Sequence, residues 1–230
     1  MRIVCALFML LVGVVANAAD QVSTGGGLGV VQDPYLGSCG TLIFSADGTY
    51  ENAYAWQYGG VVAPLYGAFA ERFDSAGLIV CGIVMDLTQT GNDAGQTCDL
   101  YVWEDAGGLP GMVLALSTSF EPGSVAVWPI LSQHFGRVTS ECGSTDATWI
   151  GYWGNWPGQA TAWFVGADLD GLGGKPYTNI APGIGYPTGW NHVSVVWGPT
   201  QAIGLGAEVV ECPHPPVKNA SWGEVKGLYR

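Results

Sequence analysis

Residues 148–166 read "TWIGYWGNWPGQATAWFVG" and indicate the fold class. Two short apolar runs flank "WPGQ", in which Pro and Gly occupy the second and third positions of a tight turn. Pairing Trp153 with Ala160 across this turn places Trp149 opposite Phe164. Both faces of the hairpin are then apolar, whereas a half-exposed hairpin alternates apolar and polar residues. The second face must therefore be covered by the rest of the chain or bind a ligand.

Short apolar runs bounded by turn sequences continue along the chain. Turns such as "ADGT", "DSAG", "TGNDAG" and "EPGS" separate them, and the chain holds 36 Gly and 13 Pro. No stretch keeps the helical period of about 3.6 over ten residues. This pattern predicts an all-β fold, an antiparallel, jelly-roll-like β-sandwich with a short C-terminal helical tail. We expect strands at Thr41–Ser45, Thr49–Trp56, Tyr66–Phe73, Leu78–Thr88, Thr97–Glu104, Met112–Ser117, Val125–Ile130, Gly136–Ser140, Ala147–Trp153, Ala160–Ala167, Ser194–Trp197 and Ala202–Val210.

The chain divides into five segments. Residues 1–18, "MRIVCALFMLLVGVVANA", are typical of a signal peptide, with Arg2 before an apolar run and a small-x-small cleavage site. Residues 19–38 are expected to be a flexible, Gly-rich lead-in, and residues 39–211 the sandwich domain. Residues 212–220 form a Pro-rich linker, and residues 221–230 a separate tail. We therefore expect an exported protein, extracellular or at the cell surface.

The acidic charge of the chain disfavours nucleic acids as partners. The net charge is −12, and only 11% of residues are charged. An acidic chain disfavours binding to the phosphate backbone of nucleic acids. The apolar run of the leader is too short to cross a membrane, and no later run is longer, so we do not expect a membrane-spanning protein.

Five cysteines follow the leader. Export makes disulfides possible, and the absence of CxxC spacing argues against zinc or thioredoxin-like chemistry. Cys39 with Cys212 would clip the ends of the domain together, and Cys81 with Cys98 flank an expected hairpin. The odd number leaves at least one thiol unpaired or bonded between chains.

The tail, "SWGEVKGLYR", fits a short helix in which Ser221 and Glu224 form a capping box. A helix of this length is unstable alone in water, so it should order only on a receptor or on its own domain. The tail resembles the Ser/Thr-Trp-Gly-x-Ile/Val-Lys-x-Leu-Tyr/Phe-Arg sorting motifs of some exported bacterial proteins. The resemblance implies recognition by export or sorting machinery through Trp222, Gly223, Lys226, Leu228, Tyr229 and Arg230. Docking back onto the sandwich is the alternative.

The body of the chain also resembles a family of secreted bacterial β-sandwich domains whose function is uncharacterised. The motifs that carry this similarity include "DGTYENAYAWQYGG", "YVWEDAGGLPG", "FVGADLDGLGG" and "WGPTQAIGLGAEV", between Asp47 and Val209. The resemblance implies a β-sandwich and export. It implies no catalytic residues.

Aromatic residues near the expected hairpin are the candidates for ligand binding. Flat rings beside small residues can stack on sugars, but they also pack well in sandwich cores. The candidates are Trp149, Trp153, Trp156 and Trp163, of which Trp156 at the turn is expected to be the most exposed.

A cation site is the second candidate. In "GADLDGLGGKPY", Asp168 and Asp170 alternate before a Gly-rich turn and could hold Ca²⁺ together with backbone carbonyls. The EF-hand pattern is absent, and Asp and Gly also favour ordinary turns.

No motif for catalysis stands out in the sequence. HExxH and G-x-S-x-G are absent, and the carboxylates cannot be placed across a cleft from sequence alone. We therefore expect a non-enzymatic module for adhesion or carbohydrate binding, with a glycan or another surface component as partner. The alternatives are a subunit of a surface layer or filament and a glycoside hydrolase of jelly-roll type.

Overall fold

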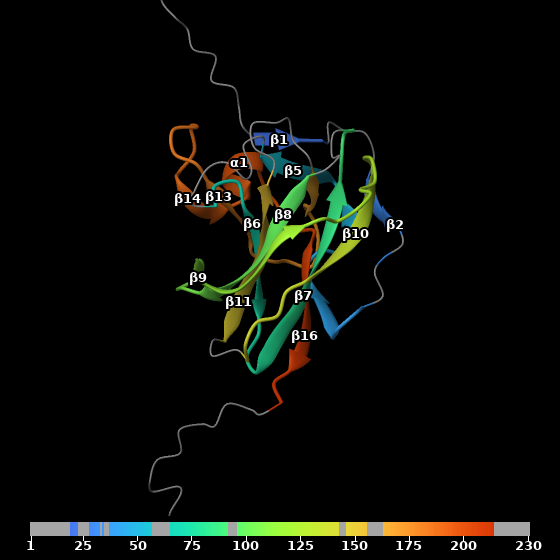
Figure 1. Ribbon diagram of the computed structural model, residues 1–230. Coiled ribbons are helices and arrows are strands. Elements are labelled where there is room, and N and C mark those ends of the chain that lie inside the picture. Colours follow the sequence, from blue (N-terminus) through green and yellow to red (C-terminus); the bar gives the residue numbers. More distant parts are fainter. Residues whose placement is uncertain are drawn as a thin grey trace, which may run out of the picture.

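The computed structural model describes residues 19–22, 28–32, 34, 37–56, 65–91, 96–142, 146–155 and 163–213. Two β-sheets packed against each other hold almost all of their regular structure (Figure 1). The predicted all-β sandwich is therefore confirmed. The signal peptide, Trp156, most of the linker and the whole tail lie outside the described residues.

Sheet A is the larger of the two. Its hydrogen-bonded order is β1 (Ala19–Gln21), β5 (Asn52–Trp56), β12 (Phe164–Asp168), β7 (Leu78–Thr88), β10 (Ile130–Arg137), β2 (Gly29–Gln32) and β4 (Thr49–Tyr50). In addition, β15 (Ala202–Ile203) pairs with β12, β16 (Leu205–Glu211) with β7, and β3 (Thr41–Phe44) with β16. Neighbours are antiparallel except β10 and β2. The central strand β7 reads "LIVCGIVMDLT" and is buried from Val80 to Thr88, as expected for a strand covered on both faces.

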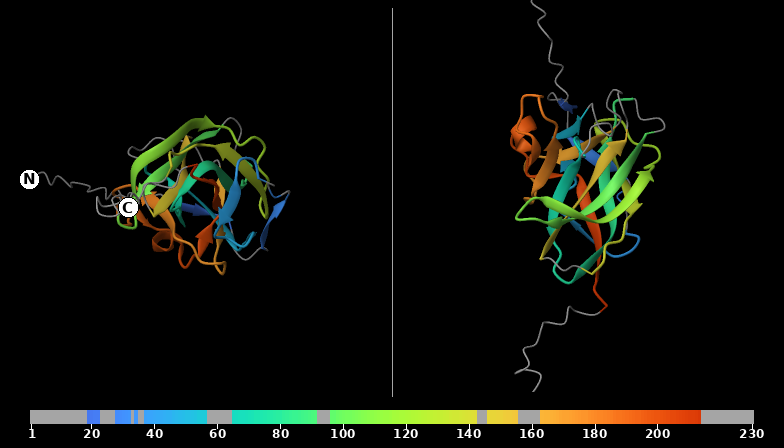
Figure 2. Two further views of the ribbon diagram at one scale, coloured as in Figure 1. Left: turned by 90° about the horizontal axis from the view of Figure 1, so that it is seen from below. Right: turned by 60° about the vertical axis from the view of Figure 1, so that its left-hand side comes forward.

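Sheet B is the layer that carries the candidate site. Its order is β14 (Gly189–His192), β13 (Pro176–Ile180), β6 (Phe69–Asp74), β11 (Ala147–Asn155), β8 (Thr97–Asp105) and β9 (Pro110–Phe120). The turn between β8 and β9 projects from the body, as the green segment in the right-hand view of Figure 2 shows. A single helical turn, α1 (Ser194–Trp197), follows β14.

The main apolar core fills the space between the sheets. Trp56 and Trp163 are almost fully buried in it, beside side chains from both layers. The short helix α1 adds Trp197, whose ring stacks on Tyr54 with centroids 4.7 Å apart. Aromatic rings of this size bury enough apolar surface to contribute about 2–3 kcal/mol each, so the core alone accounts for much of the fold's stability.

The predicted hairpin of residues 149–165 is wrong. In sheet B, β11 pairs with β6 and β8. In sheet A, β12 pairs with β5, β7 and β15. Trp149 and Phe164 are therefore not cross-strand neighbours. The physical reason is that both strands are apolar on both faces, which suits the interior of a sheet better than an isolated hairpin.

Other differences are local. Residues 194–197 form α1 rather than a strand, because a four-residue apolar run does not distinguish helix from strand. Residues 125–129, expected as part of a strand, precede β10 as a connection. Parts of the expected lead-in, residues 19–21 and 29–32, pair into sheet A as β1 and β2. Strands β13 and β14 were not predicted, since "PYTNI" and "GWNH" mix polar and apolar residues without a period.

The disulfides also differ from the prediction. Cys39 bonds to Cys81, and Cys142 bonds to Cys212. The pairing of β3 with β16, and of β16 with β7, brings residue 39 close to residue 81. Cys98 carries a free thiol buried in the core, where burial raises its pKa. Two disulfides are typical of proteins from oxidising compartments. Among the described residues, no helix is long and apolar enough to cross a membrane.

Candidate functional site

A polar hollow lies beside β6, where its pairing with β13 stops. Strand β13 pairs with β6 from Phe69 to Glu71, so the following three residues of β6 have no strand partner on that side among the described residues. The hollow has a volume of about 420 Å³. It is lined by Ser45, Arg72, Phe73, Asp74, Gly173, Gly174 and Lys175. Strand β6 and the turn before β13 thus bring together charged side chains from distant parts of the chain.

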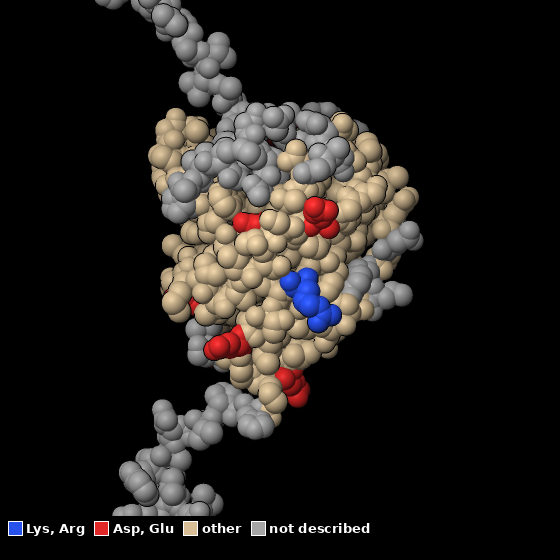
Figure 3. Space-filling model, in the orientation of Figure 1, with Lys and Arg blue, Asp and Glu red and all other residues tan. Residues whose placement is uncertain are grey.

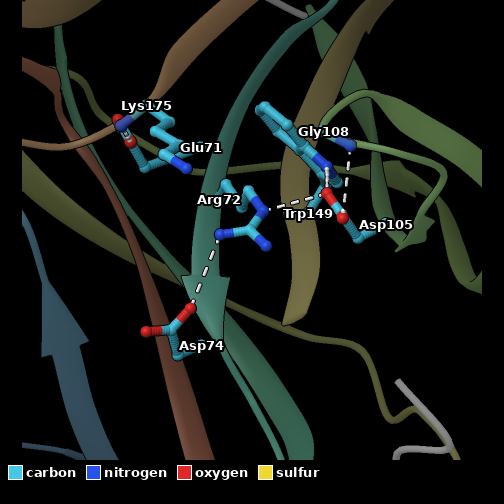
Figure 4. A network of polar contacts seen from close by, with 7 residues as sticks. All are labelled: Glu71, Arg72, Asp74, Asp105, Gly108, Trp149 and Lys175. Atoms are coloured by element: carbon cyan, nitrogen blue, oxygen red, sulfur yellow. Dashed lines mark hydrogen bonds and ion pairs between the residues drawn. The ribbon is translucent and has the colours of Figure 1, made fainter. Parts of the chain in front are cut away.

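A hydrogen bond to Asp105 holds the side chain of Arg72 in a fixed orientation. Its Nε donates a hydrogen bond to Oδ1 of Asp105 at 2.9 Å. Asp105 is itself held by Nε1 of Trp149 at 2.8 Å and by the backbone N–H of Gly108 at 3.2 Å (Figure 4). The bond from Arg72 is the main reason why the pKa of Asp105 is lowered. The guanidinium is therefore oriented before any ligand arrives.

Asp74 completes a donor and acceptor pair. Its carboxylate lies 3.5 Å from Nη1 of Arg72, and 93% of its side chain is exposed. Lys175 also lines the hollow and is exposed. Both ion pairs in the described part of the chain belong to Arg72. A long contact to an exposed carboxylate is weak in water, so both groups remain available to hydrogen-bond a ligand.

Glu71 forms the sealed floor of this region. Its carboxylate accepts hydrogen bonds from the backbone N–H groups of Lys175 and Ile203 and has no exposed surface. Burial raises the pKa of Glu71 to about 8, although these N–H donors favour the ionised form. A Cβ at Gly174 would lie 2.5 Å from Oε1 of Glu71, so this turn requires glycine. The floor is therefore tightly packed.

Three other carboxylates are buried in the same manner. Glu208 accepts the N–H groups of Ser38 and Cys39 at 2.8 and 2.7 Å. Asp86 accepts hydrogen bonds from Tyr50 and Gln133, and burial raises its pKa to about 6. These carboxylates hold loops and side chains against the sheets, so their roles are structural.

The third of these, Asp168, lies in the predicted cation site. Asp168, Asp170 and Glu51 each bring one carboxylate oxygen within 4.8 Å of the others. Asp168 accepts the N–H groups of Asp47 and Asp170, and Glu51 accepts that of Leu169. Burial raises the pKa of Asp168, although the hydrogen bonds from the backbone N–H groups of Asp47 and Asp170 lower it in part. Oxygen ligands suit Ca²⁺, whereas N–H donors also suit an ordinary turn, so calcium stays a prediction.

An outer aromatic cluster covers the face of sheet B that points away from the core. We give this name to Ala70, Tyr101, Trp103 and Trp149, with the half-buried Leu65, Trp153, Tyr177 and Trp190 packed on them. The ring of Trp190 lies edge-on to Trp103 at 5.4 Å, and that of Tyr177 lies edge-on to Trp149 at 4.9 Å. The second apolar face seen in the sequence is therefore covered by the chain itself.

The predicted ligand-binding tryptophans consequently separate. Trp149 is buried in the outer cluster and Trp163 in the main core, so neither ring offers a face to a ligand. Trp153 is half-buried, and its Nε1 donates to the backbone oxygen of Tyr66 at 3.1 Å. Trp156 and the six residues predicted for sorting in the tail lie outside the described residues.

Sequence reasoning missed the hollow. The chain has 7 Lys and Arg in all, and two of them line it. That scarcity was a usable signal for Arg72 and Lys175. Their proximity was not predictable, because it depends on β13 pairing with β6 and β13 itself was not predicted.

Comparisons with known proteins add no relative. No protein-family model matches the chain, and no curated protein and no solved structure matches it significantly.

Proposed function

We propose that this protein is an exported, non-enzymatic β-sandwich module for adhesion or carbohydrate binding, and that the hollow beside β6 is its ligand site. The observation that carries the proposal is the pair formed by Arg72 and Asp74. One side chain donates hydrogen bonds, the other accepts them, and the two lie 3.5 Å apart. Adjacent hydroxyl groups of a sugar can bridge such a pair, because each hydroxyl both donates and accepts.

The surroundings favour a neutral sugar. Arg72 and Lys175 line the hollow with Asp74, and Arg72 is also paired with Asp105, so the charges nearly balance and an anion gains little from the site as a whole. A volume of about 420 Å³ is in the range of small-ligand sites.

Glycoside hydrolysis is the alternative that the same hollow raises. A glycosidase needs two accessible carboxyl groups that flank the bond. Among the described residues of the hollow, Asp74 is the accessible carboxylate, while Glu71 has no exposed surface. This difference favours binding over hydrolysis.

The proposal is tested by titrating neutral oligosaccharides, selected from a glycan array, into the wild type and Arg72→Gln. Losing the fixed donor should weaken binding about tenfold or more, or roughly 1.4 kcal/mol. Asp74→Asn alters an almost fully exposed side chain, so it tests the acceptor without risk to folding. Arg137→Gln, an exposed cation on β10, is the matched control and should bind normally. Absence of any binding by the wild type at millimolar sugar would overturn the proposal.

Export and sorting complete the proposed role. Two disulfides fit an extracellular location, and the tail would address the protein to its final site through export or sorting machinery. Expression of the full chain and of a form lacking residues 221–230 in a secreting host that carries the cognate machinery tests this. The truncated form should be exported but fail to reach the cell surface, and equal surface delivery of both would count against the address.

A further inference from the structure

Strand β9 is a long, open edge of sheet B. It spans Pro110–Phe120, 11 residues, and within the described part of the chain it pairs with β8 and no other strand. An open edge presents unpaired backbone N–H and C=O groups, and proteins commonly protect it with charged residues. No residue from 110 to 120 is charged. The usual protection by charge is thus missing.

Exposed apolar side chains gather at the same place. Of the nine large apolar residues that are exposed in the described part of the chain, four lie between residues 109 and 116, so the exposure is concentrated on this strand and its turn. They are Leu109, Met112, Val113 and Leu116, with 42, 63, 42 and 48% exposed. Val113 is opposite Trp103, and Leu116 is opposite Tyr101. These two side chains extend the outer aromatic cluster to the edge of the sheet.

The register of β9 limits how another strand can pair with it. The pairing with β8 is irregular at three places and regular from Ala115 to Ser117. Irregularities of this kind twist an edge and shorten the ladder that a new strand can form. A partner at β9 would therefore depend mainly on apolar side chains, and the regular stretch is centred on Leu116.

We propose that a second copy of this chain occupies the edge, with the two β9 strands antiparallel across a two-fold axis near Leu116. A strand without charge can approach its own copy, although the whole chain carries a net charge of −12. The acidic side chains of β8 would then be separated by three strand spacings, about 14 Å. That distance exceeds the Debye length of about 8 Å at physiological salt, so the repulsion between the copies is screened.

The charge distribution also favours a copy over a cationic partner. On the face that Figure 3 shows, charged groups are few and lie apart on wide uncharged surface. The strand itself offers no acidic group to attract a cation. Four exposed apolar side chains on one edge strand form a smaller contact than the roughly 800 Å² per partner of stable complexes. The dimer should therefore be weak and form only at high protein concentration.

Sedimentation velocity of the wild type, Leu116→Lys and Leu172→Lys tests the proposal. Leu172 is 78% exposed and lies outside sheet B, so it is a matched control for the same change. The wild type and Leu172→Lys should dimerise at 100 µM and more strongly at 150 mM salt than at 10 mM. Leu116→Lys should remain monomeric while keeping its melting temperature.

A second variant tests the geometry. Leu116→Cys should form a disulfide-linked dimer on mild oxidation, because the two-fold axis places this residue near its copy. Ser119→Cys, away from the axis, should crosslink at least tenfold more slowly. A wild type that stays monomeric at 500 µM, or equal crosslinking of the two variants, would overturn the proposal. Dimerisation that persists in Leu116→Lys would place the interface elsewhere and would overturn it as well.

Discussion

The outer apolar face of sheet B is covered at one end of the sheet and exposed at the other. At the β13–β14 end, Trp190 and Tyr177 lie edge-on over Trp103 and Trp149, which are almost fully buried. At the β9 end, Leu116 and Val113 lie opposite Tyr101 and Trp103 on the same face. Both side chains are exposed, and their strand carries no charged residue. We call these the covered end and the open end. The difference teaches that an apolar outer face need not be a ligand site, because the chain closes part of it and leaves part of it for a partner.

Replacing Trp149 by Ala should break the covered end and have the largest effect. The ring is fully buried, and its Nε1 bond positions Asp105 behind Arg72. Removal of a buried Trp costs about 4 kcal/mol of unfolding free energy. Urea unfolding measures this cost. Leu172→Ala, on an exposed side chain, should change stability by less than about 0.5 kcal/mol. A cost below about 1 kcal/mol for Trp149→Ala would show that the covered end is not a packed core.

The pH dependence of stability tests the floor beneath the hollow, which supports the covered end. The pKa of Glu71 rises from 4.5 to about 8 on folding, because burial disfavours its charge. The folded state therefore binds more protons than the unfolded state between these values, so this contribution is complete below pH 4.5 and is lost as pH rises through 8. We expect the loss from pH 5 to pH 8 to be about 3 kcal/mol for this residue.

Glu71→Gln separates this effect from the general repulsion among the acidic groups. Glu71→Gln should lose most of the decrease in unfolding free energy that the wild type shows between pH 5 and pH 8. Glu211→Gln, at an exposed position, should keep this decrease. Urea unfolding at pH 5, 6.5 and 8 gives the comparison. Parallel curves for the wild type and Glu71→Gln would contradict the assigned role.

Trp190→Ala should expose part of the outer aromatic cluster at the covered end. The half-buried ring packs on Trp103, so its loss should cost about 2 kcal/mol and expose the ring beneath. Acrylamide quenching of tryptophan fluorescence should increase in the folded state. Leu116→Ala at the open end should leave both stability and quenching almost unchanged. Equal quenching in wild type and Trp190→Ala would mean that Trp190 does not act as a cover.

Calcium should have the smallest effect. The turn that holds Asp168 and Asp170 leads into β13, so a bound cation would stabilise the covered end. With an affinity near 1 mM, 10 mM Ca²⁺ would add about 1 kcal/mol of unfolding free energy. Thermal unfolding with and without Ca²⁺ checks this. Asp170→Asn should abolish the shift, and no shift in the wild type would leave the turn as an ordinary one.

The fold class was predictable because it depends on local signals. Turn sequences and short apolar runs identified most strands, and β7 was placed to the residue. Which strands pair was not predictable in the same way. The stretch around Trp153 suggested a hairpin, yet β11 and β12 belong to different sheets, since a strand that is apolar on both faces is compatible with either.

The site was predictable only in part. Asp168 and Asp170 lie close together, as two residues of one turn do in any fold, and their binding of Ca²⁺ stays a prediction. Glu51 lies beside them because it accepts a hydrogen bond from the backbone N–H of Leu169, which is more than a hundred residues away in the sequence. The hollow and the disulfides depend on such long-range pairings, and these are set by packing rather than by spacing along the chain.

A crystal structure of the protein with a bound neutral oligosaccharide tests the ligand site most directly. The account predicts two adjacent hydroxyl groups between the guanidinium of Arg72 and the carboxylate of Asp74, with Trp149 and Trp103 still covered. A sugar bound on another surface, with the hollow unchanged, would contradict it.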